Sequence, residues 1–108
     1  MAYNEMNSRN LPHKTDVRWF HSETVTDETS DPLILPSLGR DVAVAVTPGT
    51  AATVQYSLSS YSDVINGTAT WHDWPAGEVA GISVDGIAGA ASALRLVSTG
   101  ASSWEVSV

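Results

Sequence analysis

The fold class is decided by the C-terminal stretch Ala93-Leu-Arg-Leu-Val-Ser-Thr-Gly100-Ala-Ser-Ser-Trp-Glu-Val-Ser-Val108. Apolar and polar residues alternate on both sides of Gly100, which is the pattern of two half-buried β-strands joined by a tight turn. A turn centred on Gly100 gives Leu94–Val106, Leu96–Trp104 and Ser92–Val108 pairs on one face and an Arg95–Glu105 pair on the other. Opposite charges on directly facing residues stabilise such pairing. The stretch therefore predicts an antiparallel β-hairpin.

The same period continues upstream, between turn signals that recur every eight to twelve residues. This pattern predicts an all-β fold: a small antiparallel β-sandwich, jelly-roll or immunoglobulin-like, of six to eight strands. The expected core residues are Val42, Val44, Val54, Tyr56, Leu94, Leu96, Trp104 and Val106.

The segment between residues 59 and 77 is less regular. Ser59–Asp63 has the composition of a loop, and Asn66-Gly67 is the strongest tight-turn dipeptide of the chain. Residues 68–74 are expected to form a strand that ends at Pro75-Ala-Gly77.

The composition changes near Asp31-Pro32. Residues 1–32 carry six acidic and three basic residues and show no sustained period of two or 3.6. We therefore expect residues 1–32 to be an extended N-terminal arm, largely disordered in the free protein, and residues 33–108 to be the β-sandwich domain.

Charge and cysteine content exclude several classes of protein. The 108 residues have a net charge of −7 and no cysteine. Non-specific binding to nucleic acid needs Lys and Arg, so it is not expected, and neither is binding to an anionic membrane. A disulfide framework and a thiolate metal site are impossible. No signal peptide or membrane span is visible, so we expect a soluble protein.

The most conspicuous motif of the body is Trp71-His72-Asp73-Trp74. On a strand, His72 and Asp73 point to opposite faces, so they cannot form a hydrogen-bonded catalytic dyad. We expect one tryptophan in the core and the other at the rim, which makes Trp71 and Trp74 candidate exposed contacts with a partner or a sugar.

In the arm, Arg18-Trp19-Phe20-His21 is the main signal. Two adjacent aromatic residues in a polar segment must either fold back onto the body or anchor the arm on another subunit. We take these four residues as the candidate partner interface, with Trp19 and Phe20 as the anchor.

No cluster of ionisable residues has the spacing that acid–base or nucleophilic catalysis needs, so an enzyme is not expected. The acidic residues Glu23, Asp27, Glu28 and Asp31 lack the pattern of a calcium loop and are expected to be solvated. No metal and no cofactor are predicted.

Residues 40–108 resemble small virion proteins of tailed bacteriophages, through Thr53–Ser60, Trp71–Gly77, Ala93–Gly100 and Trp104–Val106. The resemblance does not include the arm. It implies a structural part of a particle that assembles in the host bacterial cytoplasm and is located in the virion.

Within that class, the resemblance implies a capsid decoration (cement) protein or else a neck or tail component. From the long polar arm itself we expect a clamp that holds neighbouring capsid subunits. The implied partners are the major capsid protein, other virion proteins and further copies of the chain. A small carbohydrate-binding β-sandwich that uses Trp71 or Trp74 is the alternative from a different class.

Overall fold

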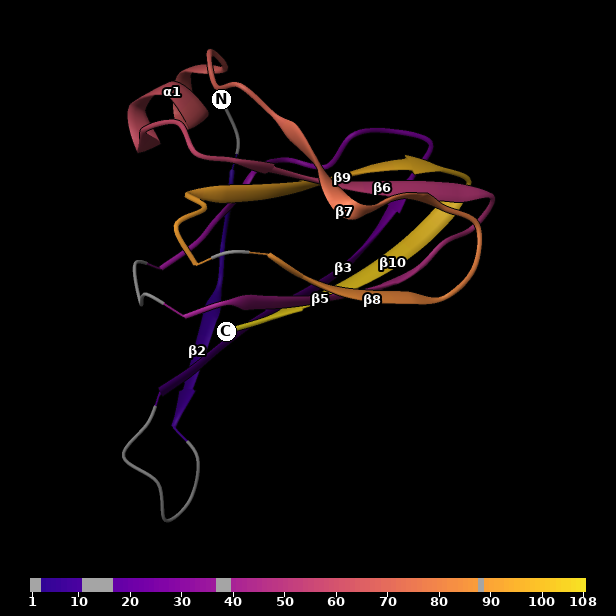
Figure 1. The fold of residues 1–108 in the computed structure, drawn as a ribbon, viewed down its shortest axis with the longest axis horizontal. Coiled ribbons are helices and arrows are strands. Elements are labelled where there is room, and N and C mark those ends of the chain that lie inside the picture. Colours follow the sequence, from indigo (N-terminus) through magenta and orange to yellow (C-terminus); the bar gives the residue numbers. More distant parts are fainter. Residues whose placement is uncertain (1–2, 11–16, 37–39, 88) are drawn as a thin grey trace.

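The computed structural model describes residues 3–10, 17–36, 40–87 and 89–108. Within these ranges the chain forms ten strands and one short helix: β1 (Asn4–Glu5), β2 (Asn7–Asn10), β3 (Val17–Thr26), β4 (Leu33–Ile34), β5 (Val42–Thr47), β6 (Ala51–Ser57), α1 (Tyr61–Asn66), β7 (His72–Val79), β8 (Ser83–Ile87), β9 (Ala93–Thr99) and β10 (Ala101–Ser107). The strands form two layers (Figure 1). The expected all-β, sandwich-like fold is confirmed.

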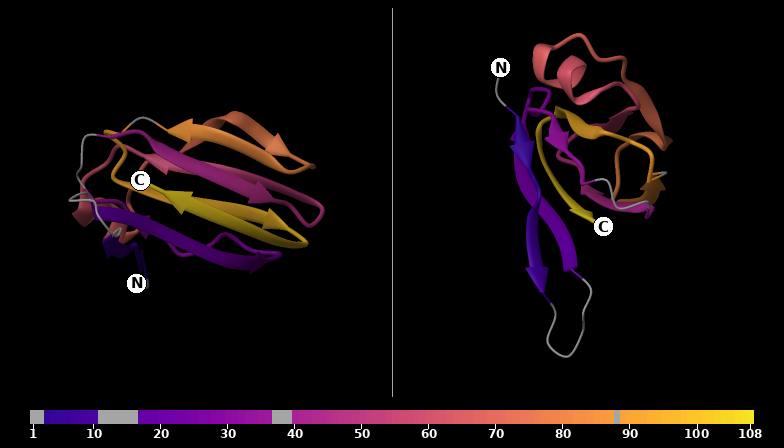
Figure 2. Two further views of the ribbon diagram at one scale, coloured as in Figure 1. Left: turned by 90° about the horizontal axis from the view of Figure 1, so that it is seen from below. Right: turned by 90° about the vertical axis from the view of Figure 1, so that its left-hand side faces the viewer.

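Each layer is a five-stranded sheet. Sheet A has the order β1-β4-β9-β6-β7, and sheet B has the order β2-β3-β10-β5-β8. The pairing of β1 with β4 is parallel, and the other pairings among the described strands are antiparallel. Figure 2 shows the strands of the two sheets running in similar directions, as in aligned sandwiches.

The core lies between the two sheets. Alternate residues of β5 are buried (Val42, Val44 and Val46), while Ala43 and Thr47 are exposed. This alternation follows from the two-residue period of a strand with one buried face. Of the eight expected core residues, seven are buried, and half-buried Tyr56 packs against them. The sequence-based prediction of the core is therefore confirmed.

The predicted hairpin between β9 and β10 is wrong, although both strands exist. The two strands belong to different sheets: β9 pairs with β4 and β6, whereas β10 pairs with β3 and β5. None of the four expected cross-strand pairs forms; Arg95 faces Gln55, and Glu105 faces Ser22 and Ala45. The apolar faces of β9 and β10 meet across the core instead of lying side by side, which removes both from water.

The turn at Gly100 carries the chain from sheet A to sheet B. Gly100 has a φ of 77°, in the left-handed region that favours glycine. Its backbone N–H donates to Asp27 Oδ1 at 2.7 Å, and its carbonyl accepts from the Asp27 N–H at 3.0 Å. The buried hydroxyls of Ser98 and Ser102 hydrogen-bond to each other at 2.8 Å beside the turn. These contacts fix a corner between sheets where the sequence indicated a flat hairpin.

The boundary expected at residue 32 does not divide the structure into an arm and a body. β3 pairs with β10 over seven residue pairs, from Ala101–Thr26 to Ser107–Phe20, and is an inner strand of sheet B. Met6 and Val25 are buried in the core, so the described part of the first 32 residues adds three strands to the sandwich. The expected number of six to eight strands is too small because it leaves out these three. Pairing with β10 stabilises a segment whose own pattern is too irregular to indicate a strand.

β2 and the first residues of β3 extend beyond the rest of the sandwich (Figures 1 and 2). The two strands pair in antiparallel register, with Arg9 directly opposite Arg18. Of the segment that the sequence suggested to be an arm, only this projection extends away from the body among the described residues.

Two further expectations are corrected between β6 and β8. Residues 61–66 form helix α1, whose N-cap Ser60 accepts a hydrogen bond from the Asp63 N–H, and Gly67 ends the helix with a φ of 77°. The Asn66-Gly67 dipeptide thus provides a helix C-cap and not a hairpin turn.

The strand expected at residues 68–74 lies further along the chain. β7 begins at His72 and continues through Pro75 to Val79. Its register with β6 shifts between Thr53 and Gln55, as at a β-bulge.

Candidate functional site

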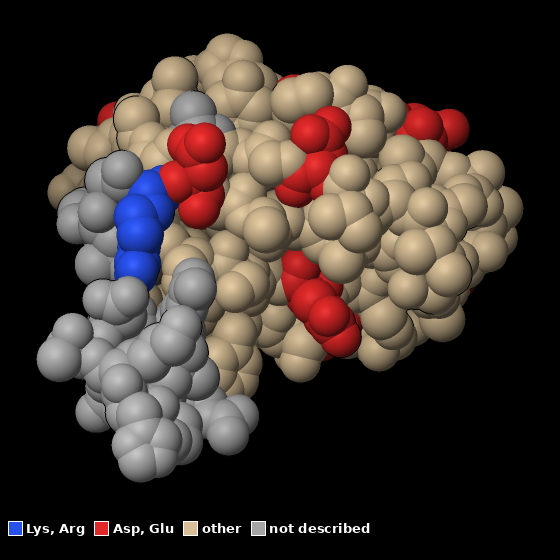
Figure 3. Space-filling model, turned by 60° about the horizontal axis from the view of Figure 1, so that its bottom comes forward, with Lys and Arg blue, Asp and Glu red and all other residues tan. Residues whose placement is uncertain are grey.

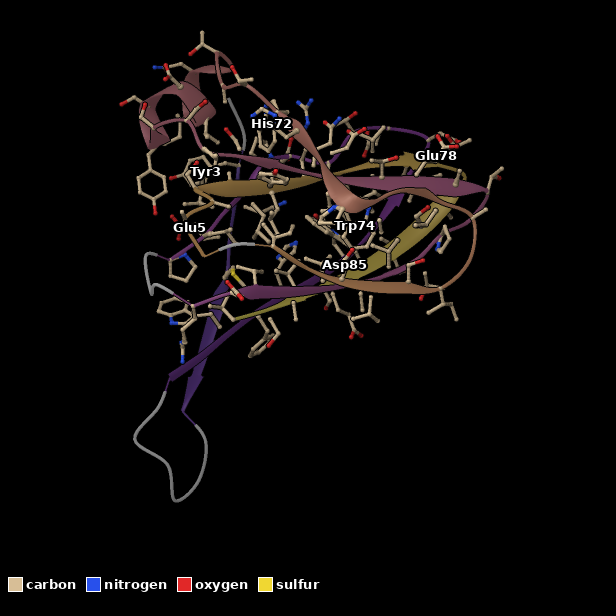
Figure 4. The ribbon with its side chains drawn as sticks, in the orientation of Figure 1. Tyr3, Glu5, His72, Trp74, Glu78 and Asp85 are labelled. Carbon is tan, nitrogen blue, oxygen red and sulfur yellow. The ribbon has the colours of Figure 1, made fainter. Side chains whose placement is uncertain are left out.

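The two tryptophans of the Trp71–Trp74 motif have different environments. Trp74 is 2% exposed and lies between the sheets (Figure 4), where its Nε1–H donates to the Gly77 carbonyl at 2.6 Å. Trp71 is half-buried and directly precedes β7, on the outer side of sheet A. The prediction of one core and one rim tryptophan is confirmed, and burial removes Trp74 from the candidate exposed contacts.

Trp71 contacts Arg95 of β9. The guanidinium carbon of Arg95 lies 4.4 Å from the centre of a Trp71 ring, a cation–π geometry. Arg95 Nε donates to Gln55 Oε1 at 2.7 Å, and Gln55 Nε2 donates to Asp73 Oδ1 at 2.9 Å. Because Arg95 faces Gln55 and Gln55 faces Asp73 in the sheet, the hydrogen bonds form a row across β9, β6 and β7.

Arg95 is a partly desolvated cation. Burial lowers the pKa of Arg95, because loss of water disfavours the charged form. The guanidinium nevertheless remains protonated at neutral pH, since the unperturbed value is so high. No carboxylate of the described residues lies within 4.0 Å of it. The positive charge is therefore positioned by a ring and an amide, and it forms no ion pair with a described residue.

The Arg95–Trp71 pair lines a pocket of about 280 Å³. The other walls come from the segment before β4, from α1 and from the helix C-cap: Ser30, Asp31, Pro32, Val64 and Gly67. The pocket thus combines an aromatic ring, a cation and a carboxylate, all from well-separated parts of the sequence. Sequence reasoning missed this site, because Arg95 was assigned to Glu105 and no local signal indicates its actual neighbours.

The candidate interface Arg18–His21 does not form one surface. Successive residues of β3 point to opposite faces of sheet B, so Trp19 and His21 turn to the inner side and Phe20 to the outer side. Trp19 packs against the core and lines a groove of about 250 Å³ with Met6, Leu35 and Tyr61. For Arg18 the structure gives only its backbone position opposite Arg9.

His21 belongs to a part-buried hydrogen-bonded cluster at the edge of the core. Its Nε2 lies 3.1 Å from Glu23 Oε1, and its ring meets that of Trp104 edge-on, with centres 6.0 Å apart. Glu23 Oε1 also accepts from Trp104 Nε1 at 3.1 Å and from Asn4 Nδ2 at 3.5 Å. This cluster links β1, β3 and β10, so His21 and Glu23 have a structural role that the sequence did not indicate.

The outer face of sheet B is broad and carries mostly small side chains. Figure 3 views the molecule from this side and shows acidic side chains that stand apart from one another on a largely uncharged surface. Val84 is 72% exposed beside Ala45, and Phe20 is 40% exposed beside Ser107. Phe20, Ser107 and Glu105 border a hollow of about 210 Å³.

Within residues 3–10, 17–36, 40–87 and 89–108, no group of three His, Asp or Glu residues is placed to hold a metal ion. In the same part of the chain, no helix is long and apolar enough to cross a membrane.

Comparison with known proteins provides no relative for this chain: no family model, no curated protein and no solved structure matches it. The functional assignment must therefore come from the site geometry.

Proposed function

We propose that this protein is a structural component of a bacteriophage virion, and within that class a capsid decoration protein that contacts neighbouring subunits. The virion class rests on the resemblance of the motifs in residues 40–108, and the observation that supports a role in subunit contacts is the outer face of sheet B. It is accessible, poor in charge, and bears two exposed apolar side chains, Phe20 and Val84. A surface that is poor in charge and carries exposed apolar side chains is typical of the central part of a protein–protein contact.

The β2–β3 projection supports the same proposal. Its two strands pair in antiparallel register, from Asn7–Phe20 to Asn10–Val17. The projection starts at Phe20 and leads away from the body, so it extends the contact surface towards a neighbour.

The proposal assigns the protein neither catalysis nor a cofactor. The structure favours this proposal over the alternative of a carbohydrate-binding module. A tryptophan that binds a neutral sugar presents an open ring face, whereas Trp74 is buried and Trp71 is stacked against Arg95.

The test is the copy number of the chain in purified phage particles, measured by quantitative mass spectrometry and located by cryo-electron microscopy. We expect a copy number that is a simple multiple of the number of capsomers, with density on the outer shell. A few copies per particle would overturn the capsid assignment in favour of the neck or tail, and absence from particles would overturn the virion proposal.

A second experiment tests the surface itself. The double substitution Phe20→Ser with Val84→Asp is expected to reduce particle occupancy at least tenfold while leaving the circular dichroism spectrum unchanged, because both side chains are exposed. Leu58→Asp is the matched control: Leu58 is 59% exposed but is not on sheet B. Equal occupancy by the double variant and the control would show that this face is not the contact.

A further inference from the structure

The Arg95–Trp71 pair has the properties of a preorganised binding group. The guanidinium is held on two sides, by the Trp71 ring at 4.4 Å and by the Gln55 side chain at 2.7 Å. Gln55 is in turn fixed by its 2.9 Å hydrogen bond to Asp73. A side chain that is already restrained loses little conformational entropy when it binds a ligand.

The terminal nitrogens of Arg95 are available. The only hydrogen bond that Arg95 makes to the described residues uses Nε, and neither terminal nitrogen is a fully buried, unsatisfied atom. Four N–H donors therefore remain at the edge of the guanidinium. Such a planar fork matches the two oxygens of a carboxylate and binds them through two parallel hydrogen bonds.

Asp31 lines the same pocket and restricts the other functional groups that a ligand can have. Its carboxylate repels a second negative charge and accepts hydrogen bonds from hydroxyl groups. The pocket volume of about 280 Å³ is just below the usual range for small-molecule sites, so only a small ligand fits. Pro32 and Val64 also line the pocket and provide apolar surface for the carbon skeleton of a ligand.

We propose that the pocket formed by Trp71, Arg95 and Asp31 binds a small hydroxylated carboxylate of the kind that a sugar acid provides. Arg95 holds the carboxylate in a bidentate pair, and Asp31 accepts from a hydroxyl group. This site lies on the outer side of sheet A, so it is separate from the contact surface proposed on sheet B. The inference does not rest on the virion assignment.

Isothermal titration calorimetry on the full chain at constant ionic strength tests the proposal, with D-glucuronate as the probe. We expect saturable binding of D-glucuronate, and binding at least tenfold weaker for D-glucose, which lacks the carboxylate, and for acetate, which lacks the hydroxyls. Inorganic phosphate is the competing anion. Tighter binding of phosphate or acetate than of D-glucuronate would overturn the ligand class.

Substitutions locate the site. Arg95→Lys keeps the charge but loses the bidentate fork, so we expect at least a tenfold loss of affinity; Asp31→Asn should weaken binding several-fold. Glu105→Gln, an exposed change on the other sheet, is the matched control and should leave the affinity unchanged.

A measurement on the unaltered protein covers the case in which a variant fails to fold. In ¹H–¹⁵N spectra, D-glucuronate should shift the Trp71 indole and Arg95 Nε–H signals and the Gly67 amide signal. Shifts elsewhere with these three unchanged would overturn the site, as would an Arg95→Lys variant that binds as tightly as the parent.

Discussion

Trp104 on β10 donates its indole N–H to the carboxylate of Glu23 on β3, with Nε1 and Oε1 3.1 Å apart. Trp104 is 1% exposed, so the hydrogen bond lies at the boundary of the core. The bond joins the C-terminal strand to a segment that the sequence suggested to be a disordered arm. The N-terminal residues and the body are therefore one folding unit.

Deletion of residues 1–32 is expected to unfold the protein. The deletion removes β3, which pairs with seven residues of β10, together with buried Met6 and Val25. Circular dichroism and urea titration should show loss of the cooperative transition. A truncated chain that unfolds cooperatively with unchanged stability would restore the arm interpretation.

Glu23→Ala is expected to lower the free energy of unfolding by about 1–3 kcal/mol, because the Trp104 indole N–H loses its acceptor at the edge of the core. Urea denaturation at neutral pH measures the change. The control is Glu28→Ala, which removes an exposed carboxylate nearby and should change stability by less than about 0.5 kcal/mol. Equal effects of the two substitutions would contradict the structural role of Glu23.

Gly100→Ala should be more destabilising than Gly81→Ala. A Cβ at residue 100 would lie 2.9 Å from the Thr50 nitrogen on a backbone with a φ of 77°, so we expect a loss of more than about 1 kcal/mol. At residue 81 nothing lies within 4 Å of the added Cβ, and the change should be within about 0.5 kcal/mol. Thermal unfolding of both variants measures the difference.

A double-mutant cycle distinguishes the observed pairing of β9 from the hairpin that the sequence suggested. Arg95→Ala combined with Gln55→Ala should show a coupling of about 0.5–1 kcal/mol, because the side chains are hydrogen-bonded at 2.7 Å. Arg95→Ala combined with Glu105→Ala should be additive to within about 0.3 kcal/mol, since the two residues are in different sheets. The reverse result would support the hairpin.

Trp74→Ala is expected to cost about 3–5 kcal/mol of stability, because it leaves a cavity between the sheets. Trp71→Ala should cost about 1 kcal/mol, which is the order of an exposed cation–π contact. Chemical denaturation of both variants provides the comparison, and a larger loss for Trp71 would reverse the assignment of core and rim.

The sequence by itself determined which residues of the body face the core. Side chains alternate along a strand with a period of two, so the apolar positions of 42–46 and 93–106 indicate an inner face whatever the strands pair with. The same rule placed Trp71 and Trp74 on opposite faces of one strand. The absence of cysteine excluded a disulfide framework and a thiolate metal site.

Only the tertiary structure decided which strands are neighbours. Alternation is equally compatible with β9 and β10 side by side in one sheet or face to face across the core. The corner at Gly100, held by Asp27, selects the second arrangement. For the same reason, the sequence did not indicate strand β3 or the Arg95–Trp71 pocket. Both depend on contacts between residues far apart in the chain, and hydrogen bonding with a distant strand stabilises segments whose local pattern is uninformative.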